Sequence, residues 1–237
     1  MSISSFLTKK FLKSLFFPAH NRGKALPKGL IRLLKKQPGF WDLPELPEIG
    51  SPLSNSGLIH DAQISISKKV NTKKCFFGVN GASGLIQSGI IAMANPGEYI
   101  LMPRNVHISV IKACALQNII PIFFDIEFSR VTGHYMPITK KWFTNVFNNI
   151  DFDNSKIAGV ILVSPYYQGY ATDLEPLIKI CHLHNLPVLV DEAHGSYFLF
   201  CENFNLPKSA LRSKADLVVH SLHKSLNGLT QTAVIWH

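Results

Sequence analysis

Residues 217–226 read Leu-Val-Val-His-Ser-Leu-His-Lys-Ser-Leu and join a short apolar run to a cluster of polar side chains. The run Leu217–Val219 is typical of a strand that is buried on both faces. Lys224 follows it among hydroxyls and imidazoles, where partial burial would lower its pKa and favour an amine that can form a Schiff base. The alternative is an ordinary exposed loop lysine, and these residues by themselves favour that alternative.

A second apolar run, Pro187–Val190, ends in the charged string Asp191-Glu-Ala-His194. A carboxylate at the end of a buried strand requires a cationic or hydrogen-bonding partner, and the protonated nitrogen of a pyridine ring is one such partner. A metal ligand and a helix N-cap are the alternatives for Asp191. A helicase, which can also carry a DExH string, is excluded because no GxxxxGK[ST] phosphate loop lies upstream.

Two further strings carry polar groups of a different kind. Asn80-Gly-Ala-Ser-Gly84 opens a predicted helix, and small residues with a hydroxyl at a helix N-terminus can bind a phosphate through free backbone amides. Pro103-Arg-Asn-Val-His107 follows another apolar run, and the His107 ring can stack on a flat aromatic cofactor. Gly-rich turns before helices are common and a lone histidine is more often structural, so neither string identifies a site by itself.

Apolar runs alternate with helical spacing from about residue 59 onward. The predicted strands are Tyr99–Met102, Ile119–Phe124, Val160–Val163, Pro187–Val190, Leu217–Val219 and Thr232–Trp236. The predicted helices are Ile59–Lys69, Gly84–Met93, Val106–Gln117 and Asp173–His184, the last with Asp173 as N-cap and Asn185 as its stop. Strands that alternate with helices predict an α/β fold with a parallel, doubly wound sheet, which binds ligands at the carboxyl ends of its strands.

The beginning of the chain differs from the rest. We predict two parts, a basic arm and connector at residues 1–58 and a major domain at residues 59–237. Residues 1–40 hold nine Lys or Arg and no Asp or Glu, so they account for the whole net charge of +9. Apolar residues alternate with the basic ones, which predicts an amphipathic helix that packs on a partner or on its own domain. The alternative is a membrane-surface or targeting role.

Several classes of protein are disfavoured by what the sequence lacks. No apolar run reaches the roughly 18 residues of a membrane span. The four cysteines form no CxxC pair, so neither a zinc site nor a disulfide framework is indicated, and no metal is expected. Scattered thiols in apolar segments favour a reducing compartment, which predicts the cytoplasm. The basic arm has no aromatic-and-basic platform beside it, so no nucleic-acid partner is expected.

Taken together, the order and spacing of these strings resemble the Orn/Lys/Arg decarboxylases, a family of fold-type-I enzymes that depend on pyridoxal phosphate (PLP). The most specific match is Ser221-Leu-His-Lys-Ser-Leu-Asn-Gly-Leu-Thr-Gln231, which is close to the family's SxHKxLxxLTQ signature. Phe17-Pro-Ala-His-Asn-Arg-Gly-Lys24 is similar to its PGHxxG segment, and Trp41-Asp-Leu-Pro-Glu-Leu46 is similar to its DLTEL-like stretch. Ser164-Pro-Tyr-Tyr-Gln-Gly169 looks like the segment after its next core strand, so the resemblance runs from about residue 17 to residue 237.

The resemblance implies both a fold and a set of catalytic roles. The fold would be the major domain of a PLP-dependent transferase, with a mostly parallel seven-stranded sheet and flanking helices. Lys224 would be the Schiff-base lysine, and Asp191 would pair with the pyridine nitrogen. Ala193 would pack under the ring of the cofactor, and His107 would stack on its opposite face.

The resemblance also implies a phosphate subsite, formed by Ser83, the amide of Gly84, Ser221 and His223. The family usually has a second hydroxyl at the position of Gly84, which would reduce one phosphate contact to backbone only. Family members continue well beyond the Schiff-base lysine. The implied fold would therefore be truncated after its last strand, and we expect a fragment, half of a split enzyme or a remnant that is not a competent decarboxylase alone.

The implied function is PLP-dependent decarboxylation of a basic amino acid, namely lysine, arginine or ornithine, with release of a polyamine or diamine. A non-catalytic PLP-binding remnant and another fold-type-I enzyme, such as an aminotransferase, are the alternatives. The implied partners are the amino-acid substrate and either identical subunits or a separately encoded C-terminal half.

Overall fold

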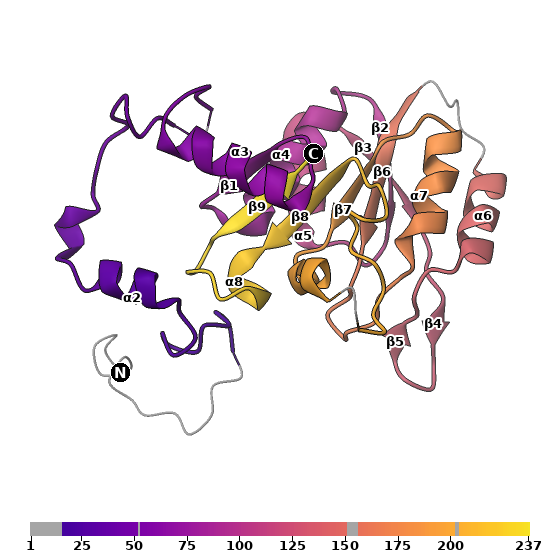
Figure 1. Ribbon diagram of the computed structural model, residues 1–237. Helices are drawn as coiled ribbons and strands as arrows, with labels where there is room; N and C mark the ends of the chain where they lie inside the picture. The colour runs from indigo at the N-terminus through magenta and orange to yellow at the C-terminus, as the bar shows by residue number, and fades with distance from the viewer. Residues whose placement is uncertain (1–15, 52, 151–155, 202–203) are drawn as a thin grey trace, which may run out of the picture.

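A computed structural model describes residues 16–51, 53–150, 156–201 and 204–237. Its centre is a sheet of seven strands with helices on both faces (Figure 1). The strands are β1 (Cys75–Gly78), β2 (Tyr99–Pro103), β3 (Ile120–Phe124), β6 (Ile157–Val163), β7 (Val188–Asp191), β8 (Leu217–Ser221) and β9 (Ala233–Trp236). A separate two-stranded hairpin consists of β4 (Phe128–Ser129) and β5 (His134–Tyr135).

The spatial order of the strands is β1-β9-β8-β7-β6-β2-β3. Strands β3, β2, β6, β7 and β8 pair in parallel, whereas β9 is antiparallel to both of its neighbours, β8 and β1. The sheet is therefore mostly parallel. Its five parallel neighbours all present their carboxyl ends at one edge, which is where sheets of this kind bind ligands.

Seven α-helices connect and cover the strands in the described part of the chain. They are α2 (Lys28–Leu34), α3 (Leu58–Val70), α4 (Gly81–Met93), α5 (Ile108–Gln117), α6 (Lys140–Asn149), α7 (Leu174–Leu183) and α8 (Leu222–Ser225). Short 3-10 turns add η1 (Pro38–Phe40) and η3 (Ser196–Phe200). None of these helices is long and apolar enough to cross a membrane.

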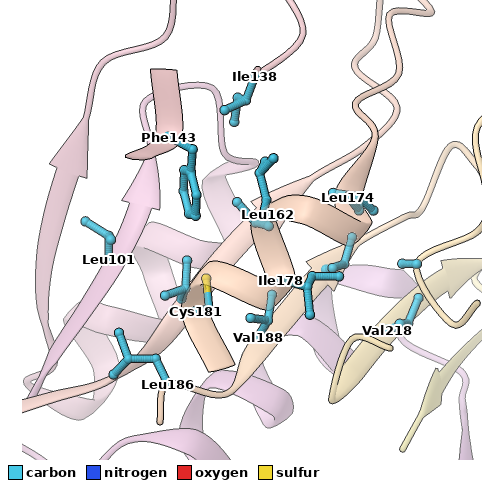
Figure 2. Close-up of a cluster of buried hydrophobic side chains, with 14 of the residues drawn as sticks. Leu101, Ile138, Phe143, Leu162, Leu174, Ile178, Cys181, Leu186, Val188 and Val218 are labelled. Atoms are coloured by element: carbon cyan, nitrogen blue, oxygen red, sulfur yellow. The ribbon is translucent and has the colours of Figure 1, made fainter. Parts of the chain in front are cut away.

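Continuous apolar runs in the central strands are buried because both faces of the sheet are covered. Leu162 of β6 and Val188 of β7 pack toward α6 and α7, where Phe143 and Ile178 meet them (Figure 2). Neighbouring side chains point to the opposite face and pack against the core formed with α4 and α5. Because side chains alternate along a strand, a strand with helices on both faces must be apolar at nearly every position.

Each predicted strand and helix is present in the structure, but some of them begin or end at a different residue. Helix α4 begins at Gly81 rather than at the predicted Gly84, because the Gly-rich turn itself adopts the first helical turn. Helix α5 begins at Ile108 because His107, predicted to be inside it, is the N-cap. Helix α7 stops as predicted, since Asn185 takes the left-handed backbone with φ of 58° just beyond its end.

Several elements were not predicted from the sequence, among them strand β1 and helix α6. Strand β1 has only four residues and is partly exposed. It is recognised as a strand by its antiparallel pairing with β9. Helix α6 is capped by the Thr139 side chain, which accepts a hydrogen bond from the Trp142 backbone N–H at 3.2 Å.

The predicted amphipathic helix of the arm lies almost wholly outside the described residues, which begin at residue 16. Further along, Figure 1 shows α2 standing apart from the sheet, and none of its residues is buried. The proposed division at residue 58 coincides with the first residue of α3, and it remains a prediction.

Candidate functional site

A cavity of about 410 Å³ lies at the carboxyl ends of β6, β7 and β8, where α4, α5 and α8 begin. Seven of the eight residues singled out in the sequence line it, namely Ser83, His107, Asp191, Ala193, Ser221, His223 and Lys224. The eighth, Gly84, lies in the first turn of α4 but is not part of the lining. Residues separated by more than a hundred positions therefore meet because parallel strands present their ends at one edge.

Asp191 is the last residue of β7, and only 7% of its surface is exposed. Its Oδ1 accepts a hydrogen bond from the Ala193 backbone N–H at 3.1 Å. Burial raises the pKa of Asp191, and that hydrogen bond together with the electrostatic interactions with Lys224, His107 and His220 opposes the shift. A carboxylate in this position gains most from a cationic group placed in the cavity.

Lys224 lies on α8, directly after the end of β8, and its amino group reaches the cavity. Its Nζ is 3.0 Å from Nε2 of His194. Burial lowers the pKa of Lys224, and the negative charge of Asp191 opposes that shift. A lysine with a lowered pKa holds a larger share of the uncharged amine, the form that attacks an aldehyde. The alternative of an exposed loop lysine is thus wrong.

His107 caps α5 and also lines the cavity, so the structural and functional readings of this residue are compatible. Its Nδ1 accepts a hydrogen bond from the Ser109 backbone N–H at 3.2 Å and lies 2.8 Å from the Ser109 hydroxyl oxygen. These contacts place the lone pair of Nδ1 toward the helix, so the hydrogen of the neutral ring is on Nε2. The helix cap thereby fixes the plane of a ring that borders the cavity.

Polar groups gather where α4 and α8 begin. Ser221 Oγ is 3.2 Å from His223 Nδ1, and this nitrogen is also 3.3 Å from the Thr232 carbonyl oxygen. A carbonyl can only accept, so Nδ1 carries a hydrogen in this arrangement. At the other helix, Asn80 makes no side-chain capping bond, and the first amide of α4, that of Gly81, donates to the Gln231 carbonyl oxygen at 2.9 Å. Free amides at a helix N-terminus are suited to an anion.

A buried polar network lies behind the cavity. Glu192 and His220 are both fully buried, with Glu192 Oε2 2.6 Å from His220 Nε2. The other nitrogen of the ring, Nδ1, accepts a hydrogen bond from Trp236 Nε1–H at 3.0 Å. An indole nitrogen only donates, so the neutral His220 ring carries its hydrogen on Nε2 and donates it to Glu192. The network joins the ends of β7, β8 and β9.

Glu192 has two further donors, which complete its hydrogen bonding. Ser209 Oγ donates to Oε2 at 2.7 Å, and the Ala210 backbone N–H donates to Oε1 at 2.8 Å. Each carboxylate oxygen is therefore satisfied without solvent. The sequence placed Glu192 in the same string as Asp191, and the structure separates them, because one lines the cavity and the other is held behind it.

The structure adds site residues to which sequence reasoning assigned no role. His194 lies in the quoted string after β7 and lines the cavity, as do Tyr167 and Gln231. The segment similar to PGHxxG also reaches the site, because the Ala19 backbone N–H donates to the His223 carbonyl oxygen at 2.9 Å. The ring of Phe17 lies 6.1 Å from that of His194. The sequence signal that could have identified His194 was its position, because it lies only three residues beyond the end of the buried strand β7.

Comparison with known proteins identifies the relatives of this chain. Residues 17–237 match the model of the Orn/Lys/Arg decarboxylase major domain. An arginine decarboxylase of Bacillus cereus is 30% identical over 218 residues, which cover 92% of this chain and 46% of that protein. The chain thus spans less than half the length of this relative.

Solved structures show the same fold at low sequence identity. The E. coli constitutive lysine decarboxylase superposes with a TM-score of 0.71 and 18% identity over 98% of this chain and 34% of that one. A structure of serine palmitoyltransferase with PLP gives 0.57 and 18% identity over 78% of this chain and 43% of that one. The predicted fold-type-I architecture is confirmed. With the family model matching nearly the whole sequence, the chain belongs to the Orn/Lys/Arg decarboxylase family.

Proposed function

We propose that this protein binds PLP through Lys224 and serves the decarboxylation of a basic amino acid: lysine, arginine or ornithine. The observation that carries the proposal is the meeting of Lys224 and Asp191 in one cavity of a chain from this family. An amine with a lowered pKa and a buried carboxylate are the two groups that a pyridine aldehyde needs at its opposite ends.

The residues that line the cavity fit the shape and charge of PLP. The start of α4 suits its phosphate, with Ser83, Ser221, His223 and the amide of Gly84 as its proposed partners. Gly81 has φ of 66°, a left-handed backbone conformation that residues with a Cβ rarely adopt, so glycine is favoured at this turn. A glycine at the start of a helix leaves the backbone open to the approach of a phosphate.

The flat part of the cofactor has two proposed neighbours. Ala193 has a small side chain that packs against a ring without displacing it, and His107 is held by its helix cap so that it can stack on the other face. Asp191 would pair with the pyridine nitrogen and keep it protonated. When bound, PLP supplies an electron sink for the bond that breaks at the substrate α-carbon.

We further propose where and in what assembly the protein works. All four cysteines are free thiols, which fits the reducing cytoplasm.

Phe17 and Tyr167 contact His194 at the cavity, yet 54% and 64% of their surfaces are exposed. Exposed aromatic side chains beside a site are suited to a partner surface, so we propose that the chain forms an oligomer. Light scattering of the purified chain, alone and with candidate partners, tests this assembly.

The experiment that tests the proposed cofactor link is borohydride reduction of the protein after incubation with PLP, followed by peptide mapping. We expect visible absorbance before reduction and a pyridoxyl group on Lys224 afterwards. The Lys224→Ala variant should lose both signals, whereas Lys112→Ala, which removes an exposed lysine on α5, should keep them. A label on another lysine, or none, would refute the assignment. Carbon dioxide release from lysine, arginine and ornithine in turn then identifies the substrate.

A further inference from the structure

The tight turn after β7 brings the imidazole of His194 within hydrogen-bond distance of the Lys224 amino group. Asp191 ends the strand, and the Gly195 backbone N–H donates to the Glu192 carbonyl oxygen at 2.9 Å, which closes the turn. A Cβ at position 195 would come within 2.6 Å of Pro165 Cδ, so only glycine fits there. The turn returns His194 to the same cavity as Asp191, where its Nε2 is 3.0 Å from Lys224 Nζ.

Aromatic neighbours restrict the orientation of the His194 ring. The Tyr167 ring meets it edge-on, with centroids 4.9 Å apart and an interplanar angle of 82°. Phe17 of the N-terminal segment contacts it from another direction at 69°, with centroids 6.1 Å apart. Rings packed edge to face favour a limited set of orientations. The nitrogen that contacts Lys224 therefore belongs to a ring whose orientation is restricted by residues from two other segments of the chain.

The charge state of the pair defines the direction of its hydrogen bond. Burial, followed by the positive charges of Lys224 and His107, lowers the pKa of His194 to about 4. The ring is therefore uncharged at neutral pH, and a lysine ammonium has no lone pair with which to accept. Lys224 donates, Nε2 of His194 accepts, and the hydrogen of the ring is on Nδ1. A second cation beside the ammonium is thereby avoided.

We propose that His194 is a positioning residue that accepts a hydrogen bond from the Lys224 ammonium and holds the amino group toward the cavity before the cofactor arrives. This inference rests on the proposed role of Lys224 and adds to it a residue that fixes the approach of the amine. A lysine side chain has four rotatable bonds, so a fixed acceptor at its end removes many unproductive orientations.

The test is the apparent pKa of Lys224 itself, measured without PLP. Competitive labelling with acetic anhydride across a pH series, read by mass spectrometry, gives this pKa with exposed Lys112 as an internal reference. Asp191 from β7, His107 from the start of α5, Tyr167 from the loop after β6 and His223 from α8 share the cavity and stay unchanged. Removal of the acceptor should lower the pKa, because the hydrogen bond stabilises the charged form.

We compare His194→Phe, which keeps a flat ring, with His194→Gln, whose Oε1 can replace the acceptor. The phenylalanine variant should lower the apparent pKa of Lys224 by about one unit, and the glutamine variant should restore most of it. His184→Phe makes the same change at an exposed histidine outside the cavity and should have no effect. Thermal unfolding of each variant checks that it is folded.

The attachment of PLP gives an independent second measurement. Compared at pH values that give each variant the same share of uncharged Lys224 amine, the rate of appearance of visible absorbance should fall about tenfold in His194→Phe and recover in His194→Gln. An unchanged Lys224 pKa in His194→Phe, or equal effects of Phe and Gln, would overturn the positioning role. If the Lys224 pKa falls in His194→Phe but PLP never attaches to Lys224, the positioning role of His194 is supported and the proposed function is refuted. If PLP attaches to Lys224 but its pKa is the same in all variants, the proposed function is supported and the positioning role is refuted.

Discussion

At the residue scale, Asp191 shows how a functional group can oppose stability. Burial raises the folded-state pKa of Asp191 above its usual range, so the charged form costs its full free energy at any pH above the folded-state pKa. That cost shrinks as the pH falls below the folded-state pKa and is gone below the unfolded-state pKa, because the buried group takes up a proton first. A protein that keeps such a group without bound ligand carries a penalty that the ligand can relieve.

Replacing Asp191 by Asn should therefore stabilise the cofactor-free protein at pH 7. Asn retains an acceptor for the Ala193 N–H but carries no charge, so we expect a gain of about 1 kcal/mol, or roughly 2–4 °C in Tm. The advantage over wild type should shrink as the pH is lowered. Thermal unfolding at a series of pH values measures it, and a variant that is less stable than wild type at pH 7 would contradict the burial argument.

The same substitution should impair the proposed chemistry. Without a carboxylate at the pyridine nitrogen the ring is a weaker electron acceptor, and we expect turnover in an active preparation to fall by about 10² to 10³. Carbon dioxide release measures the effect, with Asp61→Asn on the exposed side of α3 as the matched control. Equal turnover in Asp191→Asn and wild type would refute the assigned role.

At the element scale, helix α4 links the packing of the sheet to the site. Its first turn borders the cavity, and further along Ile90 is fully buried against the sheet whereas Ile91 is 43% exposed. Ile90→Ala should lower the free energy of unfolding by about 2–5 kcal/mol, because it removes methyl groups and leaves a void. Ile91→Ala makes the identical change on the same helix and should cost less than about 1 kcal/mol. Urea unfolding compares the two, and similar losses would show that α4 is not packed as described.

The network behind the cavity fixes the ends of three strands. Trp236→Phe keeps an aromatic side chain but removes the N–H that reaches His220, which leaves a buried acceptor unsatisfied. We expect a loss of about 1–3 kcal/mol in the free energy of unfolding. Trp142→Phe removes an indole hydrogen bond of 2.8 Å to the Asp125 carbonyl at an exposed position, where water can replace it. This control should cost less, and equal losses measured by urea unfolding would contradict the buried network.

At the scale of the whole molecule, the cofactor should act as a stabilising ligand. The cavity is formed by the ends of several strands and helices, so a ligand that fills it binds the folded state alone. PLP at a hundred times its Kd should stabilise by about 2.7 kcal/mol, which corresponds to roughly 5–10 °C in Tm for a chain of this size. Pyridoxal without phosphate should give a smaller shift at equal concentration, because it cannot use the amides of α4. Equal shifts would argue against the proposed phosphate subsite.

The sequence by itself determined the type of fold and much of the site. Apolar runs such as those of β7 and β8 must be buried on both faces, which requires a covered parallel sheet, and the polar residue that ends each run is then at the ligand-binding edge. The place of Asp191 at this edge was predictable for this reason, whereas Lys224 was singled out by the resemblance of its string to the family signature. The specific string around Lys224 also identified the family, which the comparison confirmed.

Only the tertiary structure decided which of these groups contact one another. Strand β1 spans only the four residues Cys75–Gly78 and was not predicted, and it pairs with β9 from the other end of the chain. The separate positions of Asp191 and Glu192 follow from alternation at a strand end, but the partners of Glu192 come from distant segments. The contact of His194 with Lys224 depends on a turn that only close packing defines. Local sequence sets which residues are buried, whereas distances between side chains depend on how the elements pack.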